Sequence, residues 1–202
     1  MTAKEFADAT NIGHETLQSL ERFVALLEKW QKKINLVGRA SVADVWRRHI
    51  WDSAQLAPHI ANISGTIADI GSGAGFPGIV LAIVTRRPVH LIESDVRKCV
   101  FLSEAARVTE AQVTIINRRI ESVTEIEFDI VLARALAPLD RLIGLAEPIL
   151  APAGCCFFFK GQIVTDELTE ALEHWKIIVA KIPSVTDRQG VILKLENIAR
   201  QS

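Results

Sequence analysis

The stretch Asp69-Ile70-Gly71-Ser72-Gly73-Ala74-Gly75-Phe76-Pro77-Gly78 decides the fold of this 202-residue chain. An apolar run from Ile67 to Ile70 leads directly into the glycines and predicts a buried strand. Glycine permits positive φ and lets the backbone approach a ligand closely. Pro77 suits the first turn of a following helix, whose free N–H groups would face the bound group. The sequence therefore predicts a strand–turn–helix unit with a ligand site at the turn.

From Thr66 onward, short apolar runs alternate with segments of helical periodicity. Strands that alternate with helices imply right-handed crossovers and a parallel sheet covered on both faces. Two further strand-like runs, 176–182 and 191–196, are joined by only 183–190 and therefore predict an antiparallel hairpin. We expect an α/β, Rossmann-like fold with a seven-stranded, mainly parallel sheet and an antiparallel terminal hairpin. The expected parallel strands are 67–70, 89–93, 113–116, 129–133 and 155–159, with helices at 77–84, 96–108, 139–150 and 166–174.

The first sixty residues show helical periodicity. Apolar residues from Leu17 to Ile34 recur at three- and four-residue spacing and predict one amphipathic helix. A second helix is expected from Ser41, as its N-cap, to about Ile60. We accordingly divide the chain into a helical extension, 1–62, and a cofactor-binding domain, 63–202, which together form one compact unit.

Composition and charge restrict the class of protein. The chain is 49% hydrophobic and 23% charged with a net charge of −1, which is typical of a globular protein and gives no overall signal of nucleic-acid binding. A local basic segment exists between residues 29 and 51. Such runs are more often solvated faces, although this one is large enough to meet a polyanion. Its members are Lys29, Lys32, Lys33, Arg39, Arg47 and Arg48.

Cysteine usage and hydropathy indicate a cytoplasmic protein. Cys99, Cys155 and Cys156 form no CxxC pair and leave an odd thiol, so no disulfide framework is expected. The N-terminus has no secretory pattern, and no apolar run approaches the ~20 residues that span a bilayer. His49 and Asp52 share a helix face, but no third ligand accompanies them, so we expect no metal site.

The glycine-rich stretch by itself fits two cofactors. Gly73 to Gly78 satisfies GxGxxG, the dinucleotide pattern, and Glu93 follows the next strand, where an acid that binds ribose belongs. The longer pattern DxGxGxG, which starts at Asp69 and includes Gly71, Gly73 and Gly75, resembles motif I of the class I methyltransferases. A dinucleotide-binding domain has six parallel strands, so the terminal hairpin favours the methyltransferase, with S-adenosylmethionine as cofactor.

The sequence also limits the methyl acceptor. Cytosine C5 would require an attacking cysteine, typically beside proline, and the chain has no such pair. Exocyclic adenine nitrogens are usually served by an Asn/Asp-Pro-Pro-aromatic turn after the fourth strand, whereas this chain reads Leu132-Ala133-Arg134-Ala135-Leu136-Ala137-Pro138. An acceptor with a free lone pair, such as guanine N7, needs neither a nucleophile nor a general base.

The chain resembles the RsmG (GidB) family, which methylates guanine N7 in 16S ribosomal RNA of the small subunit. The resemblance covers nearly the whole length and implies direct in-line transfer from S-adenosylmethionine to the RNA, either free or in a small-subunit particle. We expect a monomer that does not bind membranes. The motifs that carry the resemblance are Asn35-Leu36-Val37, Arg48 to Ser53, Asp69 to Gly78, Glu93 to Lys98, Arg119-Ile120-Glu121, Ala133 to Leu136 and Lys160-Gly161.

The resemblance also implies roles for individual residues. Arg134 and Lys160 are the candidate catalytic residues, acting by positioning; the alternatives are a loop ion pair for Arg134 and a solvated lysine for Lys160. Either Arg118 or Arg119 is the arginine of its motif. The expected cofactor-binding residues are Asp69, Gly71, Gly73, Gly75, Phe76, Glu93, Ile120, Glu121 and Arg134, and the RNA-binding candidates are Lys32, Lys33, Arg47, Arg48 and Arg119.

Overall fold

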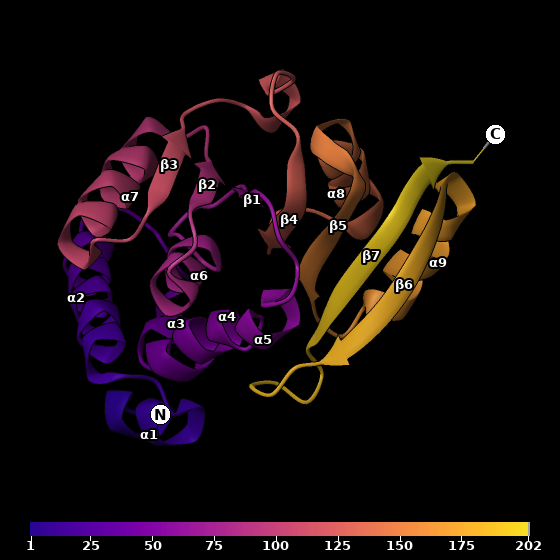
Figure 1. The fold of residues 1–202 in the computed structure, drawn as a ribbon. Helices are drawn as coiled ribbons and strands as arrows, with labels where there is room; N and C mark the ends of the chain where they lie inside the picture. Colours follow the sequence, from indigo (N-terminus) through magenta and orange to yellow (C-terminus); the bar gives the residue numbers. More distant parts are fainter. Residues whose placement is uncertain (202) are drawn as a thin grey trace.

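The computed structural model describes residues 1–201, although the side chain of Arg39 lies outside the described part. A seven-stranded sheet with the order β3-β2-β1-β4-β5-β7-β6 runs through the molecule (Figure 1). The first five strands are parallel, and β7 is antiparallel to both of its neighbours. The expected fold class and the terminal hairpin are therefore confirmed. The strands are β1 (Ile67–Ile70), β2 (Val89–Ile92), β3 (Val113–Ile116), β4 (Phe128–Arg134), β5 (Leu150–Lys160), β6 (Trp175–Pro183) and β7 (Val191–Arg200).

The helices between the parallel strands occur where they were expected, with one correction. The helix expected over 139–150 ends at Ala146, and a 3-10 turn, η3 (Glu147–Ile149), leads into β5. Pro148 explains the early end, because proline has no N–H with which to continue the helical hydrogen bonds, so the chain passes into the 3-10 turn. β5 consequently starts at Leu150 rather than Cys155. The remaining elements are α6 (Gly78–Thr85), α7 (Val96–Thr109), η2 (Ile120–Ser122), α8 (Leu139–Ala146) and α9 (Val164–His174).

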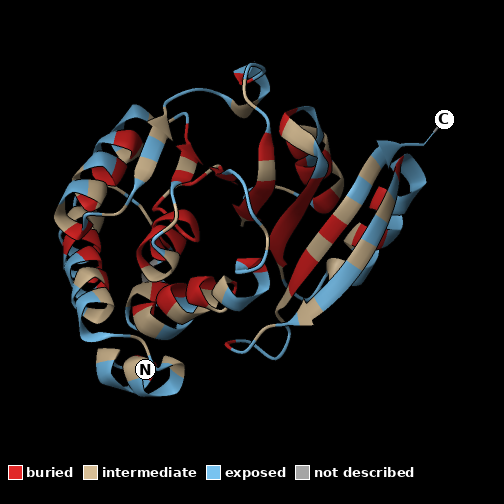
Figure 2. Ribbon diagram, in the orientation of Figure 1, coloured by how far each residue is buried: buried red, intermediate tan, exposed pale blue. Residues whose placement is uncertain are grey.

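Each face of the sheet has its own hydrophobic core. Side chains alternate along β5, so that Cys155, Phe157 and Phe159 join one core while Cys156 and Phe158 join the other. Helices α6 and α7 cover the first face, and α8 and α9 cover the second (Figure 1). Burial is continuous through the inner strands and falls toward β6 at the edge (Figure 2). Helices on both faces explain why β1 is buried along its whole length.

The N-terminal region departs from the expected pair of long helices. The first is present as α2 (His14–Gln31), and Phe23 packs against Phe76 and Phe101 in the core. The expected helix from Ser41 to Ile60 is wrong, because the backbone there divides into short segments around a π-helical turn. Ser41 lies inside the first of them rather than at an N-cap. The segments are α3 (Arg39–Val42), η1 (Trp46–Trp51), α4 (Asp52–Ala54) and α5 (Ala57–Ile60), preceded at the N-terminus by α1 (Ala3–Thr10).

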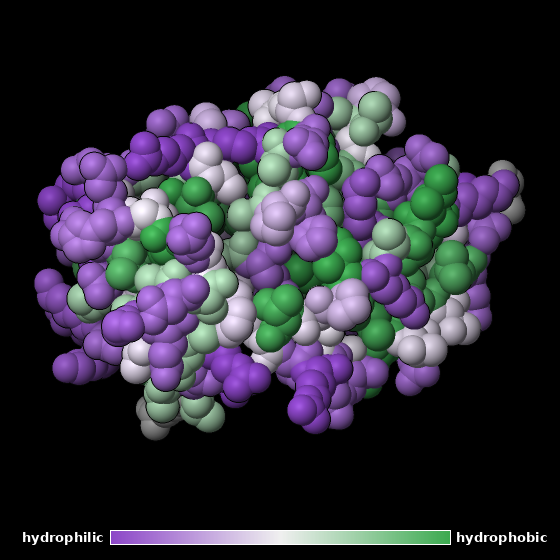
Figure 3. Space-filling view, turned by 60° about the horizontal axis from the view of Figure 1, so that its bottom comes forward, coloured by the Kyte–Doolittle hydropathy of each residue, from purple (hydrophilic) through white to green (hydrophobic). Residues whose placement is uncertain are grey.

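The N-terminal helices and the sheet contribute to the same core, and the division of the chain after residue 62 stays a prediction. On the side turned forward in Figure 3, polar side chains are interspersed with apolar patches. Within residues 1–201, none of the helices combines the length and apolarity needed to cross a bilayer.

Candidate functional site

A cavity of about 490 Å³ lies at the carboxyl ends of β1, β2 and β4. The chain moves from β1 outward to β3 and then returns to place β4 on the other side of β1, and ligands of open α/β sheets bind at such a reversal. We call this space the first cavity. Seven of the expected cofactor-binding residues line it: Gly71, Gly73, Phe76, Glu93, Ile120, Glu121 and Arg134.

The glycine turn forms the floor of the first cavity and holds Glu93 in place. Gly71, Gly73 and Gly75 all have positive φ, as the sequence predicts. The backbone N–H of Gly73 donates to Glu93 Oε2 and that of Asp95 donates to Oε1, each over 2.8 Å. A carboxylate oxygen can accept more than one hydrogen bond, so Glu93 retains acceptor capacity for a pair of hydroxyl groups.

Asp69 and Gly75 support the turn from behind and do not line the cavity. Asp69 is 1% exposed, and its Oδ2 accepts the Gly78 N–H over 3.0 Å at the start of α6. Burial raises the pKa of Asp69 to about 7. A Cβ at Gly75 would lie 2.7 Å from Ile79 Cδ1. Direct contact of these two residues with a cofactor stays a prediction.

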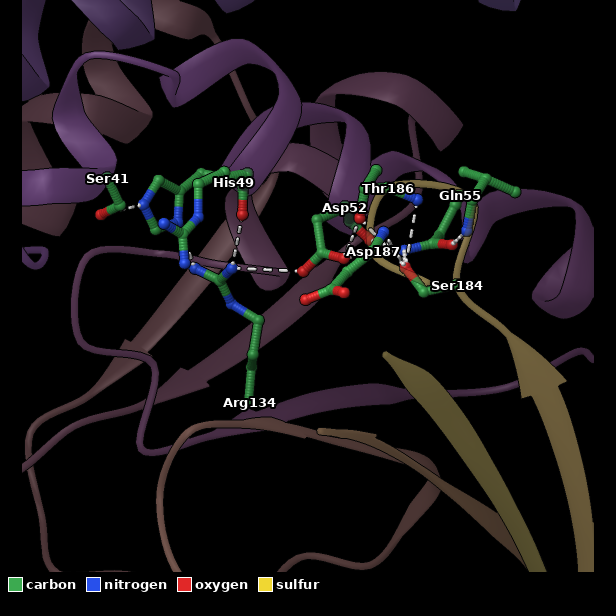
Figure 4. Close-up of polar contacts among 10 residues, drawn as sticks. Ser41, His49, Asp52, Gln55, Arg134, Ser184, Thr186 and Asp187 are labelled. Carbon is green, nitrogen blue, oxygen red and sulfur yellow. Dashed lines mark hydrogen bonds and ion pairs between the residues drawn. The ribbon is translucent and has the colours of Figure 1, made fainter. Parts of the chain in front are cut away.

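Arg134 is the last residue of β4, and its guanidinium is held by the N-terminal region (Figure 4). It donates to the Arg48 carbonyl over 3.0 Å, to Asp52 Oδ2 over 3.3 Å and to His49 Nδ1 over 2.7 Å. The guanidinium carbon also lies 5.2 Å from the centre of the Phe76 ring. Arg134 therefore forms an ion pair with Asp52, as the alternative to a site role would have it. Arg134 nevertheless also lines the cavity.

His49 continues these contacts in a directed chain of hydrogen bonds. A guanidinium can only donate, so His49 Nδ1 accepts and its Nε2 carries the proton. Nε2 then donates to Ser41 Oγ over 2.8 Å, and Ser41 donates to the Gly38 carbonyl over 2.7 Å. The ring stacks on Phe76 with centroids 4.9 Å apart. Burial, with the charges of Arg134 and Arg48, lowers the pKa of His49 to about 3, so the imidazole is neutral.

A second cavity of about 720 Å³ adjoins the first. Its walls come from the N-terminal region, the end of β5 and the β6–β7 loop. Lys160 lies here rather than in the first cavity, with its side chain 8% exposed. Its Nζ lies 2.6 Å from Glu167 Oε2 and donates to the Ala137 carbonyl over 2.9 Å, so it is not a solvated loop lysine. The two cavities share His49, Arg134, Ala135 and Leu136.

The β6–β7 loop is fastened to the N-terminal region, which sequence reasoning did not anticipate. Asp52 Oδ1 accepts from Thr186 Oγ1 over 2.8 Å. Gln55 accepts the Val185 N–H over 2.8 Å and donates to Ser184 Oγ over 3.3 Å (Figure 4). Asp52 thus contacts both Arg134, which lines both cavities, and Thr186, which lines the second cavity.

The expected RNA-binding residues divide between several places. Arg47 and Arg48 line the second cavity, while Arg118 and Arg119 line the first. The Arg118 guanidinium is occupied by Glu125 and the Ser122 carbonyl. Two cations to which the sequence analysis assigned no role also line the first cavity, and two of the expected RNA-binding residues border a separate depression beside Asn35. The former are Lys98 and Arg141, and the latter Lys32 and Lys33.

The described residues include no group of three His, Cys, Asp or Glu side chains placed to hold a metal ion. The first cavity instead has a glycine floor, a fixed carboxylate beside it and apolar walls from Phe76 and Ile120. A carboxylate that can accept hydrogen bonds from hydroxyl groups, placed beside apolar walls, fits a nucleoside.

Two solved structures with this architecture are described as methyltransferases. A putative O-methyltransferase from Klebsiella pneumoniae superposes with a TM-score of 0.63 at 14% identity, over 96% of each chain. The glycopeptide N-methyltransferase MtfA, in complex with S-adenosyl-L-homocysteine, gives a TM-score of 0.60 at 12% identity, over 73% of this chain and 89% of that one. The fold is that of the class I methyltransferases, which use S-adenosylmethionine.

Sequence comparison narrows the class to one family. Residues 16–192 match the GidB family, rRNA small subunit methyltransferase G. The Ribosomal RNA small subunit methyltransferase G of Paramagnetospirillum magneticum is 50% identical over 200 residues, which are 99% of this chain and 98% of that protein. The protein of the same name from Gluconobacter oxydans is 52% identical over 191 residues, 95% of this chain and 98% of its own. The chain therefore belongs to the GidB family.

Proposed function

We propose that this protein methylates N7 of a guanine in 16S ribosomal RNA of the small subunit, with S-adenosylmethionine as methyl donor. The observation that carries the proposal is the junction of two cavities at Arg134 and His49. A methyltransferase needs a donor site and an acceptor site that meet at the point of transfer. The first cavity provides the glycine turn and Glu93, and the second opens beside it.

The residues of the first cavity fit the methyl donor. Glu93 has acceptor capacity for the ribose hydroxyls, and its position is set by two backbone N–H groups. Ile120 and Glu121 follow β3, where they suit an adenine ring. S-adenosylmethionine supplies a methyl group on a positively charged sulfur. The chain's own contribution is to hold the donor with this carbon directed toward the second cavity.

The polar groups at the junction are arranged for positioning rather than for proton transfer. Guanine N7 has an available lone pair, so its methylation requires no general base. His49 is neutral, but both of its ring nitrogens are engaged, and Asp52 is paired with Arg134. Orienting two reactants in this way can supply much of a rate enhancement by itself.

Local basic groups support an RNA acceptor despite the net charge of −1. Arg47 and Arg48 border the second cavity, and Arg119 borders the first. N7 faces the major groove, which is deep and narrow in A-form RNA. The target guanine is therefore expected in a loop, or turned out of its stack, to enter the second cavity. We also propose that the protein acts as a monomer, either on free RNA or on an assembled particle.

Two measurements test the proposed function. Titration calorimetry with S-adenosylhomocysteine and with NADH separates a methyltransferase from a nicotinamide-dependent enzyme, and binding of NADH alone would overturn the proposal. Mapping of N7-methylguanine in small-subunit RNA from cells with and without this protein is expected to show one modified position that disappears with the protein.

A further inference from the structure

We propose that Asp187 selects the methyl acceptor by accepting hydrogen bonds from N1–H and the 2-amino group of guanine in the second cavity. The inference rests on the proposed function and adds a specificity-determining residue to it. Asp187 belongs to the β6–β7 loop and lines this cavity next to residues of the N-terminal region that hold the loop.

The charge balance of the second cavity distinguishes Asp187 from the other carboxylates there. Asp44 pairs with the amino group of Met1 at 3.1 Å, and Asp52 pairs with Arg134 at 3.3 Å. Glu167 pairs with Lys160 at 2.6 Å. Within residues 1–201, Asp187 forms no ion pair, and its carboxylate accepts only the Gln189 N–H, over 2.9 Å at Oδ1. Among the described residues that line this cavity, Asp187 is thus the carboxylate whose negative charge is not paired with a cation, and it has acceptor capacity for a ligand.

The loop presents Asp187 in a defined position. Ser184 Oγ accepts the N–H groups of Thr186 and Asp187, which closes the turn on itself. Asp52 and Gln55 then hold Thr186, Val185 and Ser184 from the N-terminal region. Figure 4 shows Asp187 extending from this loop beside Asp52, toward the side of the cavity where Arg134 lies. A carboxylate held in this way can discriminate between bases because its position is set before the base enters.

The chemistry of guanine matches this placement. N7 and O6 lie on one edge of the base, whereas N1–H and the 2-amino group lie on the edge across the ring system. If N7 faces the junction with the first cavity, the two donors face into the second cavity, which Asp187 lines and which the first cavity shares only at the junction. A carboxylate has two acceptor oxygens and suits this pair of donors. Adenine presents an acceptor at N1 and no 2-amino group, so it would leave Asp187 unpaired.

The test compares guanosine with inosine at the N7-methylated position of small-subunit RNA, prepared by splinted ligation. Inosine keeps N7, O6 and N1–H but lacks the 2-amino group. The wild-type protein is expected to favour the guanosine RNA by about 10-fold in kcat/KM, since one hydrogen bond to a charged group is lost with inosine. Asp187→Asn should lower the rate with guanosine and reduce the ratio to about twofold or less.

The matched control is Glu173→Gln, which removes an exposed carboxylate on α9 outside the cavity and should keep the wild-type ratio. Gln55→Leu, which releases the loop without touching the base, should also lower the ratio, and it replaces Asp187→Asn if that variant no longer binds S-adenosylhomocysteine. A wild-type ratio near one, or an unchanged ratio in the variants, overturns the assignment of Asp187. Failure of the wild type to methylate the guanosine RNA contradicts the proposed function instead.

Discussion

Arg134 Nη2 donates a hydrogen bond of 2.7 Å to His49 Nδ1, and this contact lies in the wall that separates the two cavities. Because the guanidinium can only donate, the contact determines which imidazole nitrogen carries the proton. The resulting chain runs through Ser41 to the Gly38 carbonyl, which borders the first cavity. Arg134 at the end of β4 is therefore held by the N-terminal region, which also lines the first cavity.

Substitutions at His49 test whether this chain positions Arg134. His49→Asn keeps an acceptor near the place of Nδ1, whereas His49→Phe keeps the stacking on Phe76 and removes the acceptor. We expect His49→Phe to lower kcat/KM for methyl transfer to small-subunit RNA by about 10-fold or more, because a buried donor of Arg134 loses its partner. His49→Asn should stay within about threefold of the wild type. Equal rates for the two variants would show that the hydrogen bond does not position Arg134.

The buried groups Asp69 and His49 should give opposite pH dependences of stability. The pKa of Asp69 rises from 3.8 to about 7, so its contribution is present below pH 3.8 and is lost as the pH rises to 7. The pKa of His49 falls from 6.5 to about 3, so its contribution is present above pH 6.5 and is lost as the pH falls. Each contributes a slope of about 1.4 kcal/mol per pH unit, and the slopes oppose one another between about pH 4 and 6.5.

Urea unfolding of single variants separates these two contributions. In Asp69→Asn, the contribution of His49 is no longer opposed. The free energy of unfolding of this variant should therefore increase from pH 4 to pH 6.5 more steeply than that of the wild type. In His49→Phe, the contribution of Asp69 is no longer opposed, so the free energy of unfolding should decrease from pH 4 to pH 6.5. Slopes of the same sign in both variants would contradict the assignment of the two protonation states.

Gly78 is expected to tolerate no side chain, for a steric reason. A Cβ there would collide with Leu91 Cδ2 and lie 2.7 Å from Asp69 Oδ2, and both neighbours are buried. Gly78→Ala should therefore destabilise the protein by about 2 kcal/mol through overpacking. Gly161→Ala is the control, since nothing lies within 4 Å of a Cβ at that position. A loss of stability of the same size in both variants would argue against overpacking as its cause.

Arg119, rather than Arg118, is expected to contact RNA phosphate. The Arg118 guanidinium is occupied by Glu125 and the Ser122 carbonyl, whereas Arg119 has no such partner among the described residues. Arg119→Ala should weaken RNA binding and reduce the slope of log affinity against log salt by about 0.7 to 0.9. Arg118→Ala should change the slope less. Fluorescence anisotropy over a series of salt concentrations measures both, and the reverse order would transfer the role to Arg118.

Much of the fold and of the first cavity could be predicted from local sequence patterns. The glycines with Asp69 indicated the turn, and the short linker 183–190 indicated the antiparallel hairpin, because both features depend on neighbouring residues. Arg134 was also placed at the correct edge of the sheet, since the carboxyl end of a parallel strand has a known position.

The acceptor side could not be predicted in this way. Thr186 and Asp52 are 134 residues apart, and the contact between them has no local signature. The π-helical turn that brings His49 and Asp52 to Arg134 also escaped prediction, because the apolar spacing of that region is compatible with an ordinary helix. The sequence did not distinguish a solvated Lys160 from a buried one, because its pairing with Glu167 depends on how the chain turns from β5 into α9.

The most direct test of the central claim is methyl transfer by the purified protein in vitro. Small-subunit RNA or particles from cells that lack the protein are incubated with it and with S-adenosylmethionine labelled in the methyl group, and the RNA is then digested to nucleosides. We predict label in 7-methylguanosine alone, approaching one per RNA molecule, and little transfer by the Arg134→Ala variant. Label in a different nucleoside, or wild-type transfer by Arg134→Ala, would contradict the account.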